Sequence, residues 1–285
     1  MRIGGAIERP YTNPEEWYKL VSELGYRAVL APVDFRASKE EKKAYIECAR
    51  EHDLVIGEVV IWKNVIAVDP YERQAAIEYC KNQLELADEL GANCCVNIAG
   101  SRGEIWDGFY QENYAKDTYA LIVDSVREII DAVKPKRTFY TIESMPWMVP
   151  DSPDAYLQLI QDIDRKAFGV HLDFVNMINC PQRYLFCDEF IEECFTKLGP
   201  HIKSIHGKDV IMENAYTTVI RESMPGTGRV NYRKVARLCE SLGPDTTLFV
   251  EHLPDFETYK KAAAYVREQA ALAGVRTDVG ITTTQ

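Results

Sequence analysis

The 285-residue sequence is poor in positive charge. Its 33 lysine and arginine residues stand against 44 aspartate and glutamate residues, which gives a formal net charge of −11 at pH 7. Binding to nucleic acid depends largely on neutralising phosphates with basic side chains, so this balance disfavours a nucleic-acid-binding protein. It also disfavours an anionic membrane surface, and we expect neither nucleic acid nor membrane as a partner.

Long apolar stretches and paired cysteines are missing too. No stretch approaches the roughly 18 apolar residues that a membrane-spanning helix needs, and the opening residues MRIGGAIERPYT lack the apolar segment of a secretory signal. The eight cysteines include no C-x-x-C pair, and several fall in apolar runs where buried free thiols are expected. These features predict a cytoplasmic protein with reduced cysteines.

What the sequence does contain is a regular alternation of strand-like and helix-like segments. The strand-like runs are residues 2–8, 28–34, 55–62, 94–100, 139–146, 168–176, 202–209 and 248–254. The helices are expected at about 13–25, 38–53, 69–91, 113–134, 151–164, 188–199, 231–243 and 255–274. Strict alternation of this kind is typical of a parallel sheet with crossover helices.

Eight repeats favour a closed (β/α)₈ TIM barrel of the α/β class. An open doubly wound sheet is the alternative, but it usually carries a Gly-rich phosphate loop after the first strand, and the sequence has none there. Local signals agree with the helix boundaries: Asn13 and Pro14 suit a helix start, and Gly25 suits a helix end. We expect one domain over residues 1–275, followed by a tail at 276–285.

Four consecutive strand-like runs carry a carboxylate or an imidazole near their C-terminal ends, namely Glu143, Asp173, His206 and Glu251. Active sites of (β/α)₈ barrels lie at this end of the strands, so we expect the four side chains to meet. Buried carboxylates are costly unless they are paired or bind a cation. Three carboxylates and one imidazole suit Mn²⁺, Mg²⁺, Co²⁺ or Zn²⁺, and we expect one divalent ion, with Mn²⁺ as the first choice.

Other polar and aromatic residues near the predicted mouth are candidates for substrate contact, since pockets for sugars combine apolar walls with a few polar groups. These candidates are Trp62, Asn97, Trp147, Asn176, Lys208 and Arg229. His171 and Asp209 are expected to support the metal site from behind. Asp209 is also a candidate to bind a substrate oxygen or to steady the loop that follows it. His252 should point away from Glu251 if the last strand is regular. The long loop at about 210–230 is expected to form a lid or an interface.

Three motifs carry a resemblance to a known family: His-Gly-Lys-Asp at 206–209, PGTGRVNYRKVARLCESLG at 225–243 and Val-Glu-His at 250–252. From about residue 1 to 274 the chain resembles the xylose-isomerase-like (β/α)₈ superfamily of sugar phosphate isomerases and epimerases. The resemblance implies that the quartet binds the metal. It also implies that Glu143 and Glu251 act as acid and base on a sugar or keto-sugar, through an enediolate.

Two departures from the ketose epimerases of that superfamily affect the substrate. Asn176 stands where they place a substrate-binding histidine, and Met212 stands where they place an arginine. The same scaffold hosts β-eliminating lyases, such as inosose dehydratase-like enzymes and the catalytic subunits of C-glycoside deglycosidases, and LDFVNMIN (172–179) resembles that branch. A lyase acting on a 3-oxo-glycoside or a keto-inositol is therefore the alternative to an isomerase or epimerase.

Two remote alternatives come from other functional classes. An apurinic-site endonuclease of the same superfamily would need extra zinc ligands and a basic surface, which five histidines and a net charge of −11 oppose. A non-catalytic subunit is opposed by the complete metal quartet. We expect a homo-oligomer or a complex with a small partner subunit.

Overall fold

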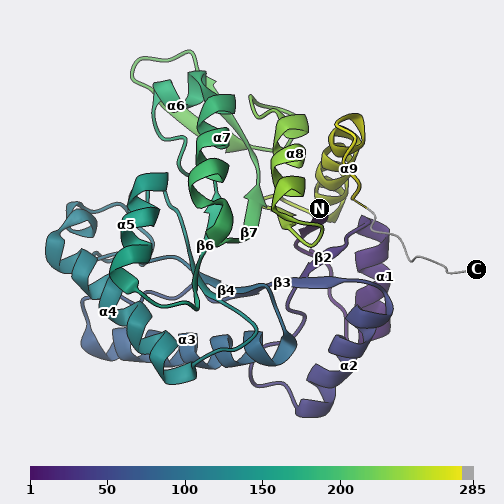
Figure 1. The fold of residues 1–285 in the computed structure, drawn as a ribbon, viewed down its shortest axis with the longest axis horizontal. Helices are drawn as coiled ribbons and strands as arrows, with labels where there is room; N and C mark the ends of the chain where they lie inside the picture. The colour runs from purple at the N-terminus through teal and green to yellow at the C-terminus, as the bar shows by residue number, and fades with distance from the viewer. Residues whose placement is uncertain (278–285) are drawn as a thin grey trace, which may run out of the picture.

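Eight parallel strands follow one another round the centre of the molecule, and helices surround them (Figure 1). The computed structural model describes residues 1–277, so residues 278–285 of the predicted tail lie outside it. The strands of the barrel are β1 (Arg2–Gly5), β2 (Ala28–Leu30), β3 (Val55–Val60), β4 (Cys94–Asn97), β5 (Tyr140–Glu143), β6 (Phe168–Asp173), β7 (Ile202–Gly207) and β10 (Thr247–Val250). This arrangement confirms the predicted (β/α)₈ barrel.

The barrel is nearly closed. Strand pairing runs in the order β1, β10, β7, β6, β5, β4, β3, β2, and every pair within it is parallel. At the remaining seam, between β1 and β2, the backbone N–H of Arg27 donates to the carbonyl oxygen of Ile3 at 2.9 Å. Because all eight strands are parallel, their C-terminal ends share one rim of the barrel.

The helices begin and end close to the residues that the sequence signals predict. They are α1 (Pro14–Leu24), α2 (Lys39–Glu51), α3 (Pro70–Leu90), α4 (Lys116–Val133), α5 (Pro153–Ile163), α6 (Pro181–Leu185), α7 (Cys187–Leu198), α8 (Tyr232–Leu242) and α9 (Phe256–Leu272), with 3₁₀ turns η1 (Gln111–Tyr114) and η2 (Gly199–His201). Asn13 caps α1 by accepting from the N–H of Glu16, and Gly25 ends it with a φ of 69°. Within residues 1–277, no helix combines the length and apolar character needed to cross a membrane.

An aromatic side chain lies inside the barrel below its C-terminal rim. The ring of Phe249 on β10 lies between Gly4 on β1 and Gly57 on β3, and a Cβ atom at either glycine would come within 2.6 Å of that ring. Phe249 is buried and also forms part of the floor of a cavity at the rim. The two glycines therefore make room for the ring of Phe249.

The long segment after β7 contains a hairpin that we did not predict from the sequence. Its strands, β8 (Asp209–Glu213) and β9 (Val219–Ser223), pair antiparallel. Asp209 fixes the base of this segment, because its carboxylate accepts hydrogen bonds from the backbone N–H groups of Val210, Gly226, Gly228 and Val230 at 2.8–3.0 Å. The predicted loop is thus an ordered arm held to the barrel by one buried carboxylate.

Candidate metal centre

The four predicted ligands come together at the C-terminal rim. Glu143 and Asp173 are the last residues of β5 and β6, His206 is the penultimate residue of β7, and Glu251 directly follows β10. One ligand atom from each lies within 4.8 Å of the others. The first three side chains are buried and Glu251 is mostly so. The geometry required of a shared cation site is therefore present, while metal binding itself stays a prediction.

One nitrogen of His206 faces the carboxylates of the quartet. Its Nδ1 lies 2.8 Å from Oε2 of Glu251 and 3.2 Å from Oε1 of Glu143. The opposite ring nitrogen, Nε2, points down into the barrel. The imidazole thus offers Nδ1 to whatever occupies the centre of the quartet.

Lys208 is the cation that the structure places among these carboxylates. Its side chain is 1% exposed, and its Nζ lies 2.5 Å from Oε1 of Glu251 and 2.9 Å from Oδ2 of Asp173. Glu222, from strand β9 of the hairpin, approaches the same ammonium at 3.2 Å. We predicted that Lys208 contacts the substrate. The structure places it in direct contact with two of the predicted metal ligands, Asp173 and Glu251.

The quartet fits a divalent cation on two grounds. Oδ2 of Asp173 and Oε1 of Glu251 are buried, and among the described residues neither accepts a well-directed hydrogen bond, although both face the Lys208 ammonium. Glu143, Asp173 and Glu251 also carry three negative charges against the single ammonium of Lys208, so a doubly charged ion would balance these four side chains. Oxygen ligands with one imidazole are a donor set that Mn²⁺ and Mg²⁺ accept.

Burial and mutual repulsion shift the protonation of the site. Burial is the main cause that raises the pKa of Asp173 to about 8, against the opposing effect of Lys208. Burial disfavours a charged His206, yet the surrounding carboxylates, Glu251 foremost, raise the pKa of its imidazole well above the ordinary value. In the absence of a metal ion, protons therefore balance part of the negative charge that Lys208 leaves uncompensated.

The two glutamates are held in their ionised forms. Burial favours the neutral carboxyl groups, but the imidazole of His206 lowers the pKa of both Glu143 and Glu251 below the ordinary value for glutamate. An ionised carboxylate is the form that accepts a proton. Both are thus in the state that a general base requires.

Sequence reasoning missed Glu58, a fully buried carboxylate on β3 beneath the quartet. Its Oε1 lies 2.9 Å from Nε2 of His171 and also accepts from the hydroxyl of Ser204, and its Oε2 lies 3.4 Å from Nε2 of His206. The signal was present in the sequence, because Glu58 is the one charged residue in the apolar run 55–62. A charge inside such a strand needs partners from other strands.

We predicted that His171 supports the metal site, and the structure shows that it contacts the quartet through His206 and through Glu58 beneath it. His171 contacts Glu58, and its ring meets that of His206 edge to face, with centroids 4.1 Å apart. Asn176 lies at the quartet, where its Nδ2 donates to Oε1 of Glu143 at 3.2 Å and to the carbonyl of Ser144 at 2.9 Å.

Two of the predicted substrate contacts lie elsewhere. Asn97 is fully buried, and its amide forms hydrogen bonds of 2.9 Å with the backbone N–H and C=O of Lys63. Its neighbour in register is Ile142, so Asn97 faces the helix layer instead of the mouth. Arg229 donates to the carbonyl of Leu185 at 2.7 Å, outside the barrel. Neither placement supports the contact that we expected.

The prediction for His252 was also wrong, because the last strand is not regular to its end. β10 stops at Val250, and His252 has a φ of 53°. This turn brings the imidazole to the mouth, where its Nδ1 lies 2.8 Å from Oε2 of Glu222. Asp209 holds the arm after β7, which agrees with the expected role of steadying the loop and not with a position behind the metal site.

Two cavities meet at His252. The smaller one, about 190 Å³, is lined by His206, Glu251 and Trp62. The larger one, about 690 Å³, lies under the hairpin and is lined by Asn176, Glu222, His252, Cys180, Arg221 and mainly apolar neighbours, among them Met145, Trp147, Ile178 and Ile220. We call the larger one the hairpin groove. The predicted contacts Trp62 and Trp147 therefore wall the two halves of the mouth.

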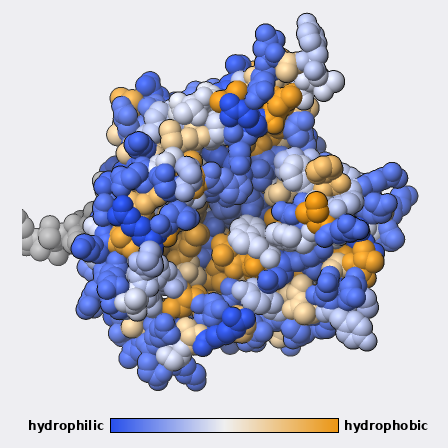
Figure 2. Space-filling model, turned by 180° about the vertical axis from the view of Figure 1, so that it is seen from behind, coloured by the Kyte–Doolittle hydropathy of each residue, from blue (hydrophilic) through white to orange (hydrophobic). Residues whose placement is uncertain are grey.

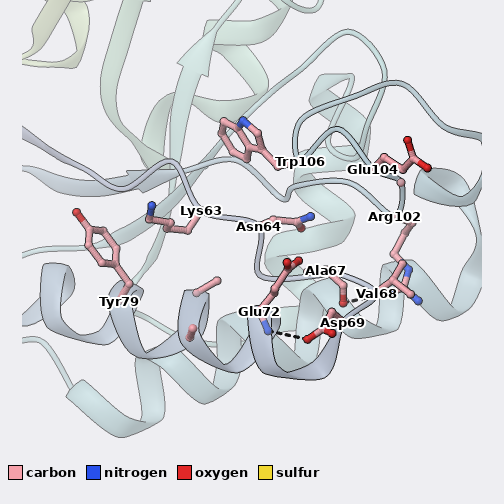
Figure 3. A pocket seen from close by; sticks show the side chains of 13 residues that line it. Lys63, Asn64, Ala67, Val68, Asp69, Glu72, Tyr79, Arg102, Glu104 and Trp106 are labelled. Carbon is pink, nitrogen blue, oxygen red and sulfur yellow. Dashed lines mark hydrogen bonds between the residues drawn. The ribbon is translucent and has the colours of Figure 1, made fainter.

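A further cavity of about 1050 Å³ lies apart from the quartet, between α3 and the loops after β3 and β4 (Figure 3). Lys63 points toward Tyr79 within it, with Nζ 5.0 Å from the ring centroid, and Arg102 is engaged by backbone carbonyls of that loop. Neither cluster of metal-ligand side chains found among residues 1–277 lies there. Its size alone does not make it the reactive site.

The surface seen from behind is mostly hydrophilic, with hydrophobic residues in small separate groups and a hollow near the centre (Figure 2).

The fold and the cluster at its rim define a (β/α)₈ barrel with a candidate metal centre. The sequence matches the profile of the xylose isomerase-like TIM barrel family over residues 18–269. The chain belongs to this family.

Curated relatives are distant. A probable endonuclease 4 of Persephonella marina is 28% identical over 183 residues, which cover 60% of this chain and 61% of that protein. An uncharacterized protein of Methanocaldococcus jannaschii is 23% identical over 194 residues, which cover 66% of this chain and 60% of that protein. The matches thus span about three fifths of the length of each relative.

Solved structures share the fold over nearly the whole chain. A xylose isomerase-like TIM barrel protein of Mycobacterium smegmatis, in complex with magnesium, has a TM-score of 0.68 at 20% identity and covers 95% of this chain and 92% of that one. An L-ribulose 3-epimerase has a TM-score of 0.71 at 12% identity and covers 96% and 95%. At these identities the likeness shows the fold alone.

Two similar structures carry different activities in their names. A probable 3-DHS dehydratase of Bacillus anthracis has a TM-score of 0.67 at 16% identity, covering 92% of this chain and 97% of that one. A 3-keto-D-glucoside 4-epimerase of E. coli has a TM-score of 0.66 at 13% identity, covering 94% and 99%. Proteins that share this fold thus carry the names of an epimerase and of a probable dehydratase.

The affinity for Mn²⁺ should rise with pH. Binding displaces the protons that Asp173, with its pKa of about 8, and His206 hold in the metal-free site, so affinity falls as the pH drops below about 8. The expected slope is about tenfold per pH unit for each proton displaced. Calorimetric titration with Mn²⁺ between pH 6 and 8, in buffers of different ionisation enthalpy, measures both slope and proton release. An affinity independent of pH would contradict this assignment.

Proposed function

We propose that the protein is a divalent-metal-dependent enzyme that removes a proton next to the carbonyl of a sugar or keto-sugar, as an isomerase or epimerase does. The observation that carries this proposal is the position of two carboxylates, Glu143 and Glu251, each with an oxygen within 4.8 Å of the other beside His206 and Asp173. Against the effect of burial, the imidazole of His206 lowers the pKa of both. Membership of the xylose isomerase-like family supports it.

The two glutamates are the proton carriers in this proposal. One takes the α-proton from one face of the substrate carbon, and the other returns a proton to that carbon or its neighbour. When bound, the divalent ion supplies Lewis-acid polarisation of the carbonyl and charge stabilisation of the enediolate.

The carboxylates of Glu143 and Glu251 have different neighbouring side chains. Asn176 donates to Oε1 of Glu143, and Lys208 pairs with Oε1 of Glu251. Because one glutamate faces an amide and the other an ammonium, their affinities for a proton differ, which suits the division into acid and base.

A β-eliminating lyase is the second candidate, and the hairpin groove favours it. Its volume of about 690 Å³ lies in the range of about 300–1,000 Å³ that holds drug-sized ligands, whereas the cavity at His206 and Glu251 is about 190 Å³. A free sugar needs only the smaller space. In this proposal a glycoside places its ring there and its substituent in the hairpin groove, whose lining includes Trp147 and Ile220.

The first step of the two candidates is the same. Removal of the α-proton leaves an electron pair on carbon; in the lyase that pair forms a C=C bond while the β-substituent leaves with its bonding electrons and then gains a proton. In the isomerase the pair is reprotonated instead. The site residues therefore serve both, and the substituent in the groove distinguishes them.

Wild-type protein with Mn²⁺ should exchange the α-proton of a keto-sugar with solvent deuterium. Glu143→Gln and Glu251→Gln should each lower that rate at least about 100-fold, because an amide cannot carry the proton. NMR or mass spectrometry of D-fructose, D-psicose and 3-oxo-glucose measures the exchange. Glu257→Gln, a change of an exposed carboxylate on α9, is the matched control and should exchange at the wild-type rate. Equal rates in all four proteins would refute the proposed role of the two glutamates.

A substituent on the sugar should raise kcat/KM if the groove holds it. We expect phenyl 3-oxo-glucoside to exceed 3-oxo-glucose by at least about tenfold, since burying a phenyl ring removes on the order of 100 Å² of apolar surface at roughly 25 cal/mol per Å². Ile220→Ser should reduce this preference and leave kcat/KM for free 3-oxo-glucose within about threefold. Product analysis then shows whether phenol is released. Equal kcat/KM for the two substrates in the wild type would remove the support for the lyase.

A further inference from the structure

A carboxylate deep in the barrel governs the geometry of the metal quartet from below. Glu58 lies on β3, away from the strand ends, and is 0% exposed. Its hydrogen-bonding neighbours come from β6 and β7, so one side chain joins the interior of three strands. The free-energy cost of burying its charge is offset only by these donors.

The two nitrogens of His206 face different partners. Nδ1 looks up to Glu251 and Glu143, at 2.8 and 3.2 Å, while Nε2 looks down to Oε2 of Glu58 at 3.4 Å. A metal-binding histidine donates its second ring N–H to a partner, and that partner selects the tautomer. Glu58 is the acceptor beneath Nε2.

The remaining contacts of Glu58 fix its own orientation. Its Oε1 lies 2.9 Å from Nε2 of His171 and accepts from the hydroxyl of Ser204, which in turn lies 3.0 Å from the hydroxyl of Thr247 on β10. With Oε1 held in this way, Oε2 is the oxygen left for His206. The carboxylate cannot rotate toward the quartet without breaking both bonds.

A second cation between Glu58, His171 and His206 is the competing explanation, because their ligand atoms also lie within 4.8 Å of one another. The separation of 2.9 Å between Glu58 and His171 is that of a hydrogen bond, and a cation bound between them would replace that bond and the one from Ser204. The contacts present are those of shared protons.

We propose that Glu58 is the positioning residue that holds His206 as the Nε2–H tautomer, and so presents Nδ1 to the divalent ion of the proposed function. Glu58 is not a ligand of the ion in this role. Its effect is on the affinity and stoichiometry of metal binding. One ion per chain is expected.

Two substitutions separate the contact from the charge. Glu58→Gln keeps the shape and removes the charge, while Glu58→Asp keeps the charge and withdraws the oxygens by one methylene. We expect Mn²⁺ to bind about 10- to 100-fold more weakly to both variants than to the wild type. Calorimetric titration measures affinity and stoichiometry, and circular dichroism in the presence of a chelator confirms that each variant folds.

The outcomes are distinct. Wild-type affinity in Glu58→Asp with weak binding in Glu58→Gln would mean that only the charge matters, which overturns the positioning role. Wild-type affinity in both variants overturns it as well. Two ions bound to the wild type would favour the second cation site instead. No binding to the wild type would refute the metal dependence of the proposed function itself.

A second measurement reads the tautomer of His206 without a change at Glu58, and so covers the case in which the Glu58 variants fail to fold. Two-bond ¹H–¹⁵N spectra of the five histidines, recorded with Mg²⁺, identify the protonated nitrogen of each ring, and a His206→Asn variant assigns the signal of His206. A proton on Nε2 and none on Nδ1 supports the proposal. A proton on Nδ1 overturns it.

Discussion

The repulsion among carboxylates confined to one end of the barrel is the constraint on which the rest of this site depends. Glu143, Asp173 and Glu251 are gathered within 4.8 Å by strands that the fold holds parallel. Their charges need compensation, which comes from Lys208, from protons on Asp173 and His206 and, in our proposal, from a divalent ion. The same excess of negative charge that makes the site costly to build favours the binding of a cation there.

The surrounding architecture serves to hold this cluster in place. Phe249, seated between Gly4 and Gly57, closes the barrel below the rim. Asp209 ties down the arm after β7, and that arm carries Glu222 to Lys208 and His252. The cavity at His206 and Glu251 is small, while the hairpin groove beside it is wider, a difference in size that suits the sugar ring and the substituent of the proposed lyase substrate.

The fold and the quartet could be predicted from the sequence because both follow from local patterns. Eight apolar runs define the strands. Side chains along a strand alternate between the inside and the outside of the barrel, so a polar residue at the end of a run lies at the mouth only when its position in this alternation points inward. Asn97 also ends a run, but its position in the alternation points outward, where it binds the Lys63 backbone. Glu58 was missed because its partners lie 113, 146 and 148 residues away. His252 was misplaced because a positive φ turns the chain just after β10.

The most direct test of the account is to locate the ion itself. Anomalous diffraction at the manganese edge, from crystals of the protein grown with Mn²⁺, reports the position of each bound ion without reference to activity. The account predicts one peak per chain, ligated by Glu143, Asp173, Nδ1 of His206 and Glu251. An absence of any peak at the C-terminal rim, or a peak lying instead between Glu58, His171 and His206, would contradict it.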